Sequence, residues 1–245
     1  MVISPFLLPK EMSDILSFFN NKHKIAWVGD KFQKKEFEVA KNYDKIYYTD
    51  SYFVQESKKF NFPRSEYLPL AYNEKIFNNK NYKTRENKLL FIGNLTKDRV
   101  NFMKSISSIN LKLIGKNNQR AFNHLSNVDI VNKNISILEV AEEYNKVKFI
   151  LNMKHETNVV NGLNMRTFEA IASGSCLFQD NLKDIESNFE VNKEILIYDN
   201  SEDLIELLNK YSRDTKTLNK IIKEGGKVVF HKHRYLHRIK KILDI

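Results

Sequence analysis

Two residues of opposite charge, Arg166 and Glu169, stand three positions apart in the segment NMRTFEAIASGSCLFQD at residues 164–180. Asn164 is a good N-cap and a glycine follows at position 174, so the segment predicts a helix over 165–173. Residues three apart share one helix face, so Arg166 and Glu169 lie side by side. The expected buried stripe on the opposite face is Met165, Phe168 and Ala172.

A cation at the amino end of a helix is unfavourable by a few tenths of a kcal/mol, so Arg166 breaks a local rule. An anionic ligand would offset that cost, because the free amides of the helix and Arg166 would hold it together. Glu169, one turn later, could accept hydrogen bonds from two neighbouring hydroxyls. A nucleotide diphosphate with its ribose has this arrangement; the alternative is a surface Arg–Glu pair.

A second candidate site follows the apolar run LLFIG, in the segment FIGNLTKDR. Gly93 and Asn94 form the turn after an expected strand, and Lys97 and Arg99 follow at the start of a helix. Glycine lets backbone amides approach a phosphate closely, and the two cations could meet a diphosphate. A plain turn with solvated charges is the alternative, because the segment is neither a dinucleotide fingerprint nor a Walker loop.

Short apolar runs alternate with segments of helical spacing through the C-terminal two thirds of the chain. This alternation predicts βαβ units, and therefore an α/β fold with a parallel sheet covered on both faces. The expected strands are 89–93, 111–115, 128–131, 149–153, 176–178 and 195–198, with helices in 99–108, 138–147, 165–173 and 202–211. The N-terminal part repeats the pattern, with strands at 24–28 and 45–49 and a helix across 10–20.

All four prolines lie in the first third of the chain, and a polar stretch without apolar periodicity separates this part from the rest. We therefore expect a small N-terminal unit over 1–72, a linker over 73–88, a ligand-binding domain over 89–230 and a terminal helix over 231–245. The terminal helix carries Tyr235, Ile239 and Ile242 on one stripe.

The net charge of +10 suggests an anionic partner, such as a phosphorylated substrate, a nucleic acid or an acidic membrane surface. The cations are mostly lysines scattered among asparagines, which disfavours nucleic acid and leaves loose attraction to acidic lipid head groups. No run is long enough to span a membrane and the N-terminus lacks signal-peptide features, which predicts a cytoplasmic protein.

No residue pattern indicates a metal site. His231, His233 and His237 fall in a basic helix, where a solvated face is expected rather than zinc. The single cysteine, Cys176, lies in an apolar run and is expected to be buried and inert.

Several long segments together resemble a known family. They are NGLNMRTFEAIASGSCLFQD, FEVNKEILIYDNSEDLIELL and HKHRYLHRI near the C-terminus, with YLPLAYNEKIF and FIGNLTKDR before them. In order and spacing they are similar to the nucleotide-binding half of GT-B glycosyltransferases, and most similar to the branch related to the spore maturation protein CgeB. The resemblance implies two Rossmann-like domains, with the C-terminal helix returning to an unusually small N-terminal one.

The resemblance also implies roles for single residues. Glu169 would bind the ribose, and Arg166 would face the diphosphate or the sugar together with the loop that holds Asn161, Gly162 and Asn164. Gly93 with Asn94 and Arg99 would flank the phosphates. Donor phosphates in this fold are neutralised by protein cations and helix dipoles, a role for Lys97, Arg99 and Arg166 that needs no metal or other cofactor.

Two departures from the family pattern concern the acceptor side and the sugar. Asn161 stands eight positions before Glu169, where many retaining enzymes carry an acid that contacts the donor sugar. The unit over 1–72 is about half as long as a usual acceptor domain, so the acceptor pocket is expected to be either minimal or completed by a second copy or a partner subunit. Inverting members take a catalytic base from the N-terminal domain, and Asp30 is our candidate, with His23 and Asp50 as rivals. His155 is a further candidate for contact with phosphate or sugar.

These features predict a glycosyltransferase that moves a sugar from a nucleotide diphosphate donor, such as a UDP- or GDP-sugar, to a glycan, glycolipid or protein. The first alternative is a non-catalytic nucleotide-sugar-binding or scaffolding subunit of a larger transferase. A basic nucleic-acid-binding protein is the second alternative, and only the charge favours it.

Overall fold

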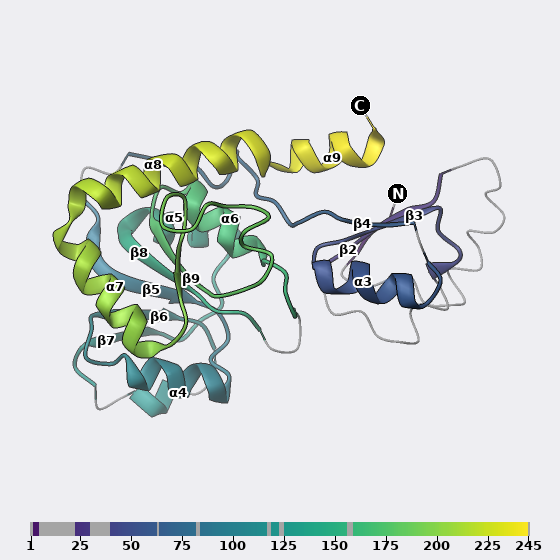
Figure 1. Cartoon of the computed structure of the whole chain (residues 1–245). Helices are drawn as coiled ribbons and strands as arrows, with labels where there is room; N and C mark the ends of the chain where they lie inside the picture. The colour runs from purple at the N-terminus through teal and green to yellow at the C-terminus, as the bar shows by residue number, and fades with distance from the viewer. Residues whose placement is uncertain are drawn as a thin grey trace.

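The computed structural model describes residues 2–4, 23–29, 40–62, 64–81, 84–116, 119–122, 125–155 and 159–244. Within these ranges the chain forms two separate parallel sheets, each at the centre of its own unit (Figure 1). The first sheet contains β1 (Val2–Ser4), β2 (Ile25–Val28), β3 (Lys45–Tyr48) and β4 (Ser65–Tyr67). The second contains β5 (Glu86–Ile92), β6 (Leu111–Ile114), β7 (Val128–Val131), β8 (Val147–Asn152), β9 (Cys176–Asp180) and β10 (Leu196–Tyr198).

Helices follow most strands and cover the sheets. In the described ranges they are α3 (Ser51–Lys59), α4 (Lys97–Ser105), α5 (Ile137–Lys146), α6 (Met165–Ala172), α7 (Ser201–Arg213), α8 (Thr215–Lys232) and α9 (Tyr235–Leu243), with a 3₁₀ turn over Gln119–Phe122. The α/β class expected from the alternating pattern is confirmed. The helix expected across 10–20 lies outside the described residues.

The larger sheet has the strand order β10-β9-β8-β5-β6-β7, with every neighbouring pair parallel. Within this sheet the chain therefore starts at the central strand β5 and adds β6 and β7 on one side. It then crosses back to place β8 on the other side of β5. At such a reversal the connections leave the sheet on opposite faces, which opens a crevice at the carboxyl ends of the two middle strands. In this sheet the crevice must lie between β5 and β8.

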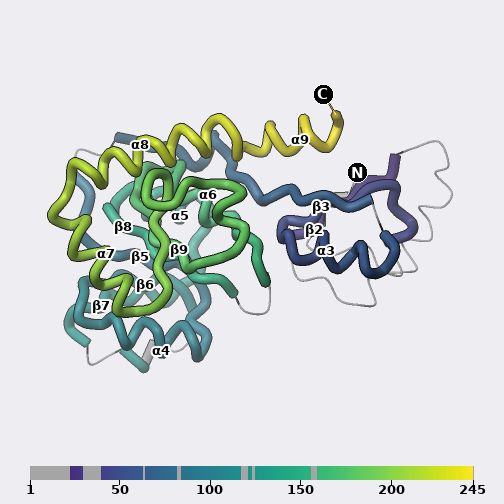
Figure 2. Tube along the Cα trace, in the orientation of Figure 1, coloured from purple at the N-terminus to yellow at the C-terminus, as the bar shows by residue number. Residues whose placement is uncertain are grey.

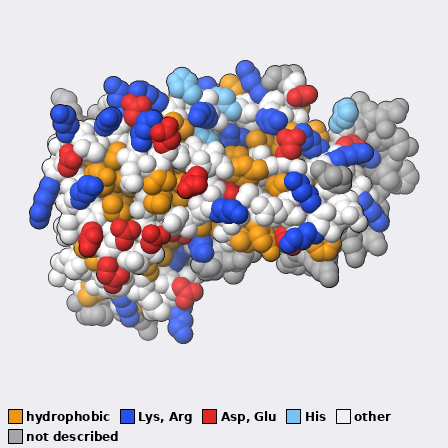
Figure 3. All heavy atoms as spheres, viewed as in Figure 1, with side chains coloured by type: hydrophobic (Ala, Val, Ile, Leu, Met, Phe, Trp, Pro, Cys, Tyr) orange, Lys and Arg blue, Asp and Glu red, His pale blue; other side chains and the backbone are white. Residues whose placement is uncertain are grey.

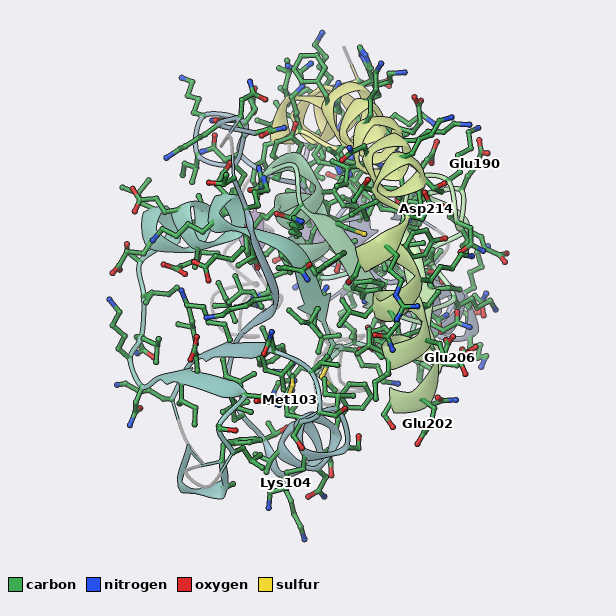
Figure 4. All side chains as sticks on the ribbon, turned by 90° about the vertical axis from the view of Figure 1, so that its left-hand side faces the viewer. Met103, Lys104, Glu190, Glu202, Glu206 and Asp214 are labelled. Atoms are coloured by element: carbon green, nitrogen blue, oxygen red, sulfur yellow. The ribbon has the colours of Figure 1, made fainter. Side chains whose placement is uncertain are left out.

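Alternation along the strands gives this sheet two apolar faces. On one face the strand side chains pack against α4 and α7; they are Leu89, Phe91, Leu111, Leu113, Phe149, Cys176 and Phe178. The other takes Leu90, Ile92, Ile114, Ile150 and Leu177 and packs them against α5 and α6. Figure 4 shows the matching division on α4, where Met103 points toward the sheet and Lys104 points away. Cys176 is buried, as expected.

The smaller sheet has the order β1-β2-β3-β4 and is also parallel throughout. Its described strands follow one another in sequence without a reversal, so they form no switch-point crevice of their own. Helix α3 packs on this sheet through Phe53, which shares a core cluster with Ile46 and Tyr48. Neither α3 nor β4 is among the elements expected from the sequence.

Two connections join the units, and Figure 2 traces both. The first is the extended segment after β4, which ends in β5; β5 begins at Glu86, so the last residues of the expected linker belong to a strand. The second is the long helix α8, followed by α9, which lies over the smaller unit. Helix α9 contacts that unit where Tyr47 donates a hydrogen bond to the carbonyl of Lys241, and where Ile242 packs with Trp27.

The expected single terminal helix over 231–245 is instead the end of α8 and the whole of α9, broken at His233. The expectation of a solvated His233 was wrong. Its ring lies 4.8 Å from the ring of Phe168 and 5.3 Å from that of Phe189, and burial lowers its pKa to about 3. Its Nδ1 lies 2.7 Å from a guanidinium nitrogen of Arg238. Tyr235 and Ile242 of the expected stripe pack against the smaller unit, whereas Ile239 is exposed and Arg238 is buried instead.

Arg238 fixes the angle between the last two helices and the connection. Its guanidinium donates to the carbonyls of Pro69, Leu70 and Lys232 at 2.7, 2.8 and 2.7 Å. One buried cation thus joins the end of α8, the start of the connection and α9. The return of the C-terminal helix to the smaller unit, expected from the resemblance, is confirmed.

Charges are unevenly spread over the face shown in Figure 3. Acidic side chains gather over α7, whose outward-facing Glu202 and Glu206 are labelled in Figure 4, while lysines and arginines spread over the rest of that face. Among the described helices, none combines the length and apolar composition needed to cross a bilayer.

Two adjacent glycines of α8 give a matched test of this packing. A Cβ at Gly225 would lie 2.3 Å from the carbonyl oxygen of Glu194, whereas a Cβ at Gly226 would meet nothing within 4 Å. We expect Gly226→Ala to raise the free energy of unfolding by about 0.5–1 kcal/mol through helix propensity. Gly225→Ala should lower it by about 1–3 kcal/mol, because α8 must move off its neighbour. Urea unfolding of both variants measures this; equal effects would contradict the packing described.

Candidate functional site

A cavity of about 400 Å³ lies at the crevice between β5 and β8. The carboxyl ends of β5, β6 and β8, the loop between β7 and α5, and the amino end of α6 form its walls, and the smaller unit and the connection contribute one residue each. The lining residues are Gly29, Leu70, Ile92, Gly93, Asn94, Arg99, Ile114, Gly115, Lys133, Asn134, Ile135, Val140, His155, Val159, Asn164, Met165 and Arg166.

The structure brings together five of the residues that the sequence marks as candidates. Gly93 and Asn94 come from the end of β5, Arg99 from α4, and Asn164 and Arg166 from the start of α6; all five line the cavity. These positions are far apart in the sequence and meet because the strand order reverses here. His155, the further candidate for phosphate or sugar contact, also lines it.

The glycines at this edge are needed for close backbone packing. A Cβ at Gly115 would lie 2.0 Å from the carbonyl oxygen of Gly93, so no side chain fits between the ends of β5 and β6. A Cβ at Gly93 would lie 3.2 Å from the ring of Phe91 and 3.6 Å from a guanidinium nitrogen of Arg99, so a side chain there would also be tightly packed. Backbone therefore forms this floor of the cavity.

Arg99 is held rigidly at one side of the cavity. Its guanidinium donates to the carbonyls of Met153 and Lys154 at 2.7 and 3.1 Å and to that of Asn94 at 3.1 Å. It also lies over the ring of Phe91, 5.3 Å from the centroid. These contacts orient the cation without neutralising it.

Arg166 lies close enough to Arg99 for the two charges to repel. The pKa of Arg99 is lowered first by burial and second by Arg166. The Nε of Arg166 is buried without a hydrogen-bond partner among the described residues. Neither guanidinium forms an ion pair with a described residue; Asp180 acts on Arg99 and Glu169 on Arg166 only at longer range, which leaves both cations able to bind an anion.

The amino end of α6 also lacks the usual side-chain cap. Asn164 is the N-cap residue, but its side chain makes no capping bond. Instead its amide exchanges two hydrogen bonds with the buried amide of Asn152, at 2.9 and 3.1 Å. Asn152 in turn donates to Thr167 and Gln179 at 3.1 and 2.8 Å. This network anchors the helix end to β8 and β9 and holds the Asn164 side chain away from the first-turn amides, of which that of Thr167 donates to the Asn164 carbonyl at 3.2 Å.

The cavity is electropositive. None of the described residues that line it is acidic, and besides the two arginines it contains Lys133, which pairs at 2.8 Å with the exposed Glu139 on α5. Uncapped helix amides and convergent guanidinium groups are the donors that proteins use for phosphate. No group of three or more acidic, histidine or cysteine residues in the described ranges could hold a metal ion.

Glu169 lies outside the set that lines the cavity and is only 6% exposed. Burial raises the pKa of its carboxyl to about 7, against a smaller opposing effect of Arg166. The alternative of a surface Arg166–Glu169 pair is therefore wrong for Glu169, and so was the expectation of a buried Met165, which is 41% exposed. Helix α6 is turned so that its amino end, rather than one side, meets solvent.

The remaining candidates are more scattered. Lys97 begins α4 and is exposed away from the cavity lining, while Asn161 and Gly162 lie in the loop before α6 and contact the smaller unit. Asp30 lies outside the described residues; its neighbour Gly29 lines the cavity. The rival Asp50 is buried and accepts three backbone amides, which does not suit a base.

Sequence reasoning missed the loop after β7, which supplies Lys133, Asn134 and Ile135. The general position of ligands at the ends of parallel strands could have pointed to this loop. It also missed the buried amides of Asn152 and Gln179, which carry no local signal because their partners lie on other elements.

The model of one protein family, described as glycosyl transferase-like, matches residues 97–244, which is more than half of the chain. The chain belongs to this glycosyl transferase-like family. The match includes α4, α6, α9 and most of the cavity wall. Among curated protein sequences there is no match.

Solved glycosyltransferase structures resemble the whole chain. Sucrose-phosphate synthase from Thermosynechococcus elongatus has 12% identity and a TM-score of 0.72, over 96% of this chain and 70% of that one. HepE from Anabaena, in complex with UDP, has 8% identity and a TM-score of 0.74, over 95% and 76%. A glycosyltransferase from Rickettsia africae has 12% identity and a TM-score of 0.67, over 96% and 78%. The shared fold is GT-B, with an N-terminal sheet that is short in this chain.

The buried carboxyl of Glu169 predicts a pH dependence of stability. Its pKa is about 7 in the folded chain against an ordinary 4.5, so the protonated form stabilises the fold below pH 4.5 and this contribution is lost as the pH rises through 7. Glu169→Gln should therefore be more stable than wild type at pH 8, by about 1–3 kcal/mol, and similar at pH 4.5. Urea unfolding at both pH values measures this. A constant difference between the two proteins would contradict it.

Proposed function

We propose that this chain binds a nucleotide diphosphate sugar in the cavity between β5 and β8 and transfers the sugar to an acceptor. The observation that supports this most directly is the joining of Arg99, Arg166 and the uncapped end of α6 in one cavity without acidic lining residues. A diphosphate is the anion that two such cations and a helix amino end suit best.

The pyrophosphate would lie at the amino end of α6, between Arg166 and Arg99, with the backbone of Gly93 and Asn94 against it. Glu169 would accept hydrogen bonds from the ribose hydroxyls, which requires its carboxylate form and some movement of the Arg166 side chain that lies near it. Lys133 and Asn134 line the same cavity from the loop between β7 and α5. Because protein cations supply the positive charge, the proposed reaction needs neither metal nor other cofactor.

In the proposed reaction an acceptor oxygen forms a bond to the anomeric carbon of the sugar as the bond from that carbon to the phosphate oxygen breaks. The leaving diphosphate keeps the electron pair, and its growing negative charge lies where the two guanidinium groups and the helix end attract it. Asp30, which follows the cavity residue Gly29 in the sequence, stays our candidate for accepting the acceptor proton in an inverting reaction.

HepE has been solved with UDP and with UDP-glucose, which favours a UDP-sugar as the donor, with a GDP-sugar as the alternative.

We propose that the chain acts in the cytoplasm, in contact with the acidic inner face of a membrane, on a glycan, glycolipid or protein. We further propose that it belongs to the branch related to CgeB, that residues 1–72 form the acceptor side, and that a second subunit completes it.

A non-catalytic donor-binding subunit is the second candidate. The side chain of Asn161 stands where many retaining enzymes have an acid, and it donates to Ser51 at 3.1 Å instead of lining the cavity. This arrangement favours binding without transfer. Release of free UDP from UDP-glucose when acceptor extracts are added separates the two candidates: the transferase releases it, and the binding subunit does not.

Arginine variants test the donor site. We expect wild type to bind UDP, and Arg166→Ala and Arg99→Ala each to weaken this binding about 10- to 100-fold, because each removes a charge-assisted contact to phosphate. The matched control is Arg213→Ala, which removes an exposed arginine from the end of α7. Isothermal titration calorimetry measures all four proteins. Equal affinity for UDP in all of them would show that the phosphates bind elsewhere.

A further inference from the structure

A carboxylate of the smaller unit holds the loop that leads into the cavity wall. Asp50 follows β3 by two residues and caps α3, where its Oδ1 accepts the amide of Tyr52 at 2.9 Å. Its Oδ2 accepts the amides of Val160 and Asn161, at 2.7 and 3.0 Å, from the other unit. The side chain is 3% exposed. One charged group therefore satisfies backbone donors on both sides of the junction between the units.

Three neighbouring contacts tighten this junction. A Cβ at Gly162 would lie 2.8 Å from the carbonyl oxygen of Thr49 and 2.9 Å from the Cβ of Asp50, so the two backbones pack without a side chain between them. Asp184 of the larger unit accepts the amide of Ser51 at 2.9 Å, and the side-chain amide of Asn161 donates to the hydroxyl of Ser51 at 3.1 Å. The contact is thus reciprocal, with a carboxylate from each unit accepting amides of the other.

The loop that Asp50 holds is part of the proposed donor site. Val159 lines the cavity immediately before it, and Asn164, Met165 and Arg166 line the cavity immediately after it. A shift of residues 160–162 would therefore move the amino end of α6 relative to Arg99. Asp50 itself is absent from the residues that line the cavity, and both of its oxygens are occupied by amides.

We propose that Asp50 is a positioning residue, through which the smaller unit sets the amino end of α6 for the donor diphosphate. The effect on nucleotide affinity rests on the function proposed above, whereas the effect on the loop does not. A hydrogen bond to a charged acceptor is stronger than one between neutral groups, so two of them give the junction a defined geometry. The smaller unit would thus contribute to donor binding although it supplies few of the cavity's lining residues.

Two variants separate this role from simple folding. Asp50→Asn keeps the shape and one oxygen that can cap α3, but its amide nitrogen cannot accept the amides of Val160 and Asn161. Asp50→Ser also keeps a good N-cap and is too short to reach the other unit. The matched control is Asp44→Asn, which removes a carboxylate that accepts the amide of Lys24 at 2.7 Å within the smaller unit. Gly162→Ala disturbs the same junction from the opposite side.

Amide hydrogen exchange measures the junction directly. In Asp50→Asn and Asp50→Ser we expect exchange at Val160 and Asn161 to become about tenfold faster or more, with the core of β8 unchanged, while Asp44→Asn leaves both amides as in wild type. Unchanged exchange at both amides in the two Asp50 variants would overturn the proposal. If either variant fails to fold, the other and Gly162→Ala decide the same question.

Affinity for UDP then measures the consequence. We expect both Asp50 variants and Gly162→Ala to bind UDP about tenfold more weakly than wild type, and Asp44→Asn to match wild type. Faster loop exchange with wild-type affinity would overturn the positioning role. Absence of UDP binding by wild type would instead refute the proposed function. The exchange data alone would then test whether Asp50 holds the loop at Val160 and Asn161.

Discussion

The anchoring of Asn164 by Asn152 is the interaction on which the site depends. A free N-cap asparagine would normally turn its side chain onto the amides of its own helix. Here the exchange of two hydrogen bonds with a buried amide on β8 holds that side chain away from the first turn of α6. The helix end is thereby fixed to the sheet and still open to an anion. The two nearby arginines then add positive charge beside a helix end whose orientation the sheet already fixes.

Two buried charged side chains join the two units in a similar way, because each makes several hydrogen bonds. Arg238 uses one guanidinium to hold α8, α9 and the connection together, and Asp50 uses one carboxylate to hold α3 and the loop before α6. Both groups are buried, so their orientation is costly to change. The cavity lies beside both contacts, and the relative position of the units therefore governs its shape. A small N-terminal unit whose described strands form no switch point fits this supporting role.

Local signals in the sequence predicted most of the strands and the position of helix α6. Apolar runs and their spacing located eight of the strands, and the capping residues located α6 to within one residue. The convergence of Gly93, Arg99 and Arg166 was expected from the family resemblance, and the reversal of strand order in the larger sheet produces it. Burial at Glu169 and His233 could not be predicted, because it arises from helices α5, α8 and α9 packing over α6. The junction at Asp50 was missed because a backbone amide as partner has no side-chain signature in the sequence.

A structure determined with UDP bound tests the central claim most directly. The account predicts the pyrophosphate in the cavity between β5 and β8, within hydrogen-bonding distance of the first-turn amides of α6 and of the Arg166 guanidinium. A second cavity, of about 480 Å³, lies beside Arg85, Gly174 and Thr215. Pyrophosphate bound there, or nucleotide that leaves the end of α6 untouched, would contradict the account.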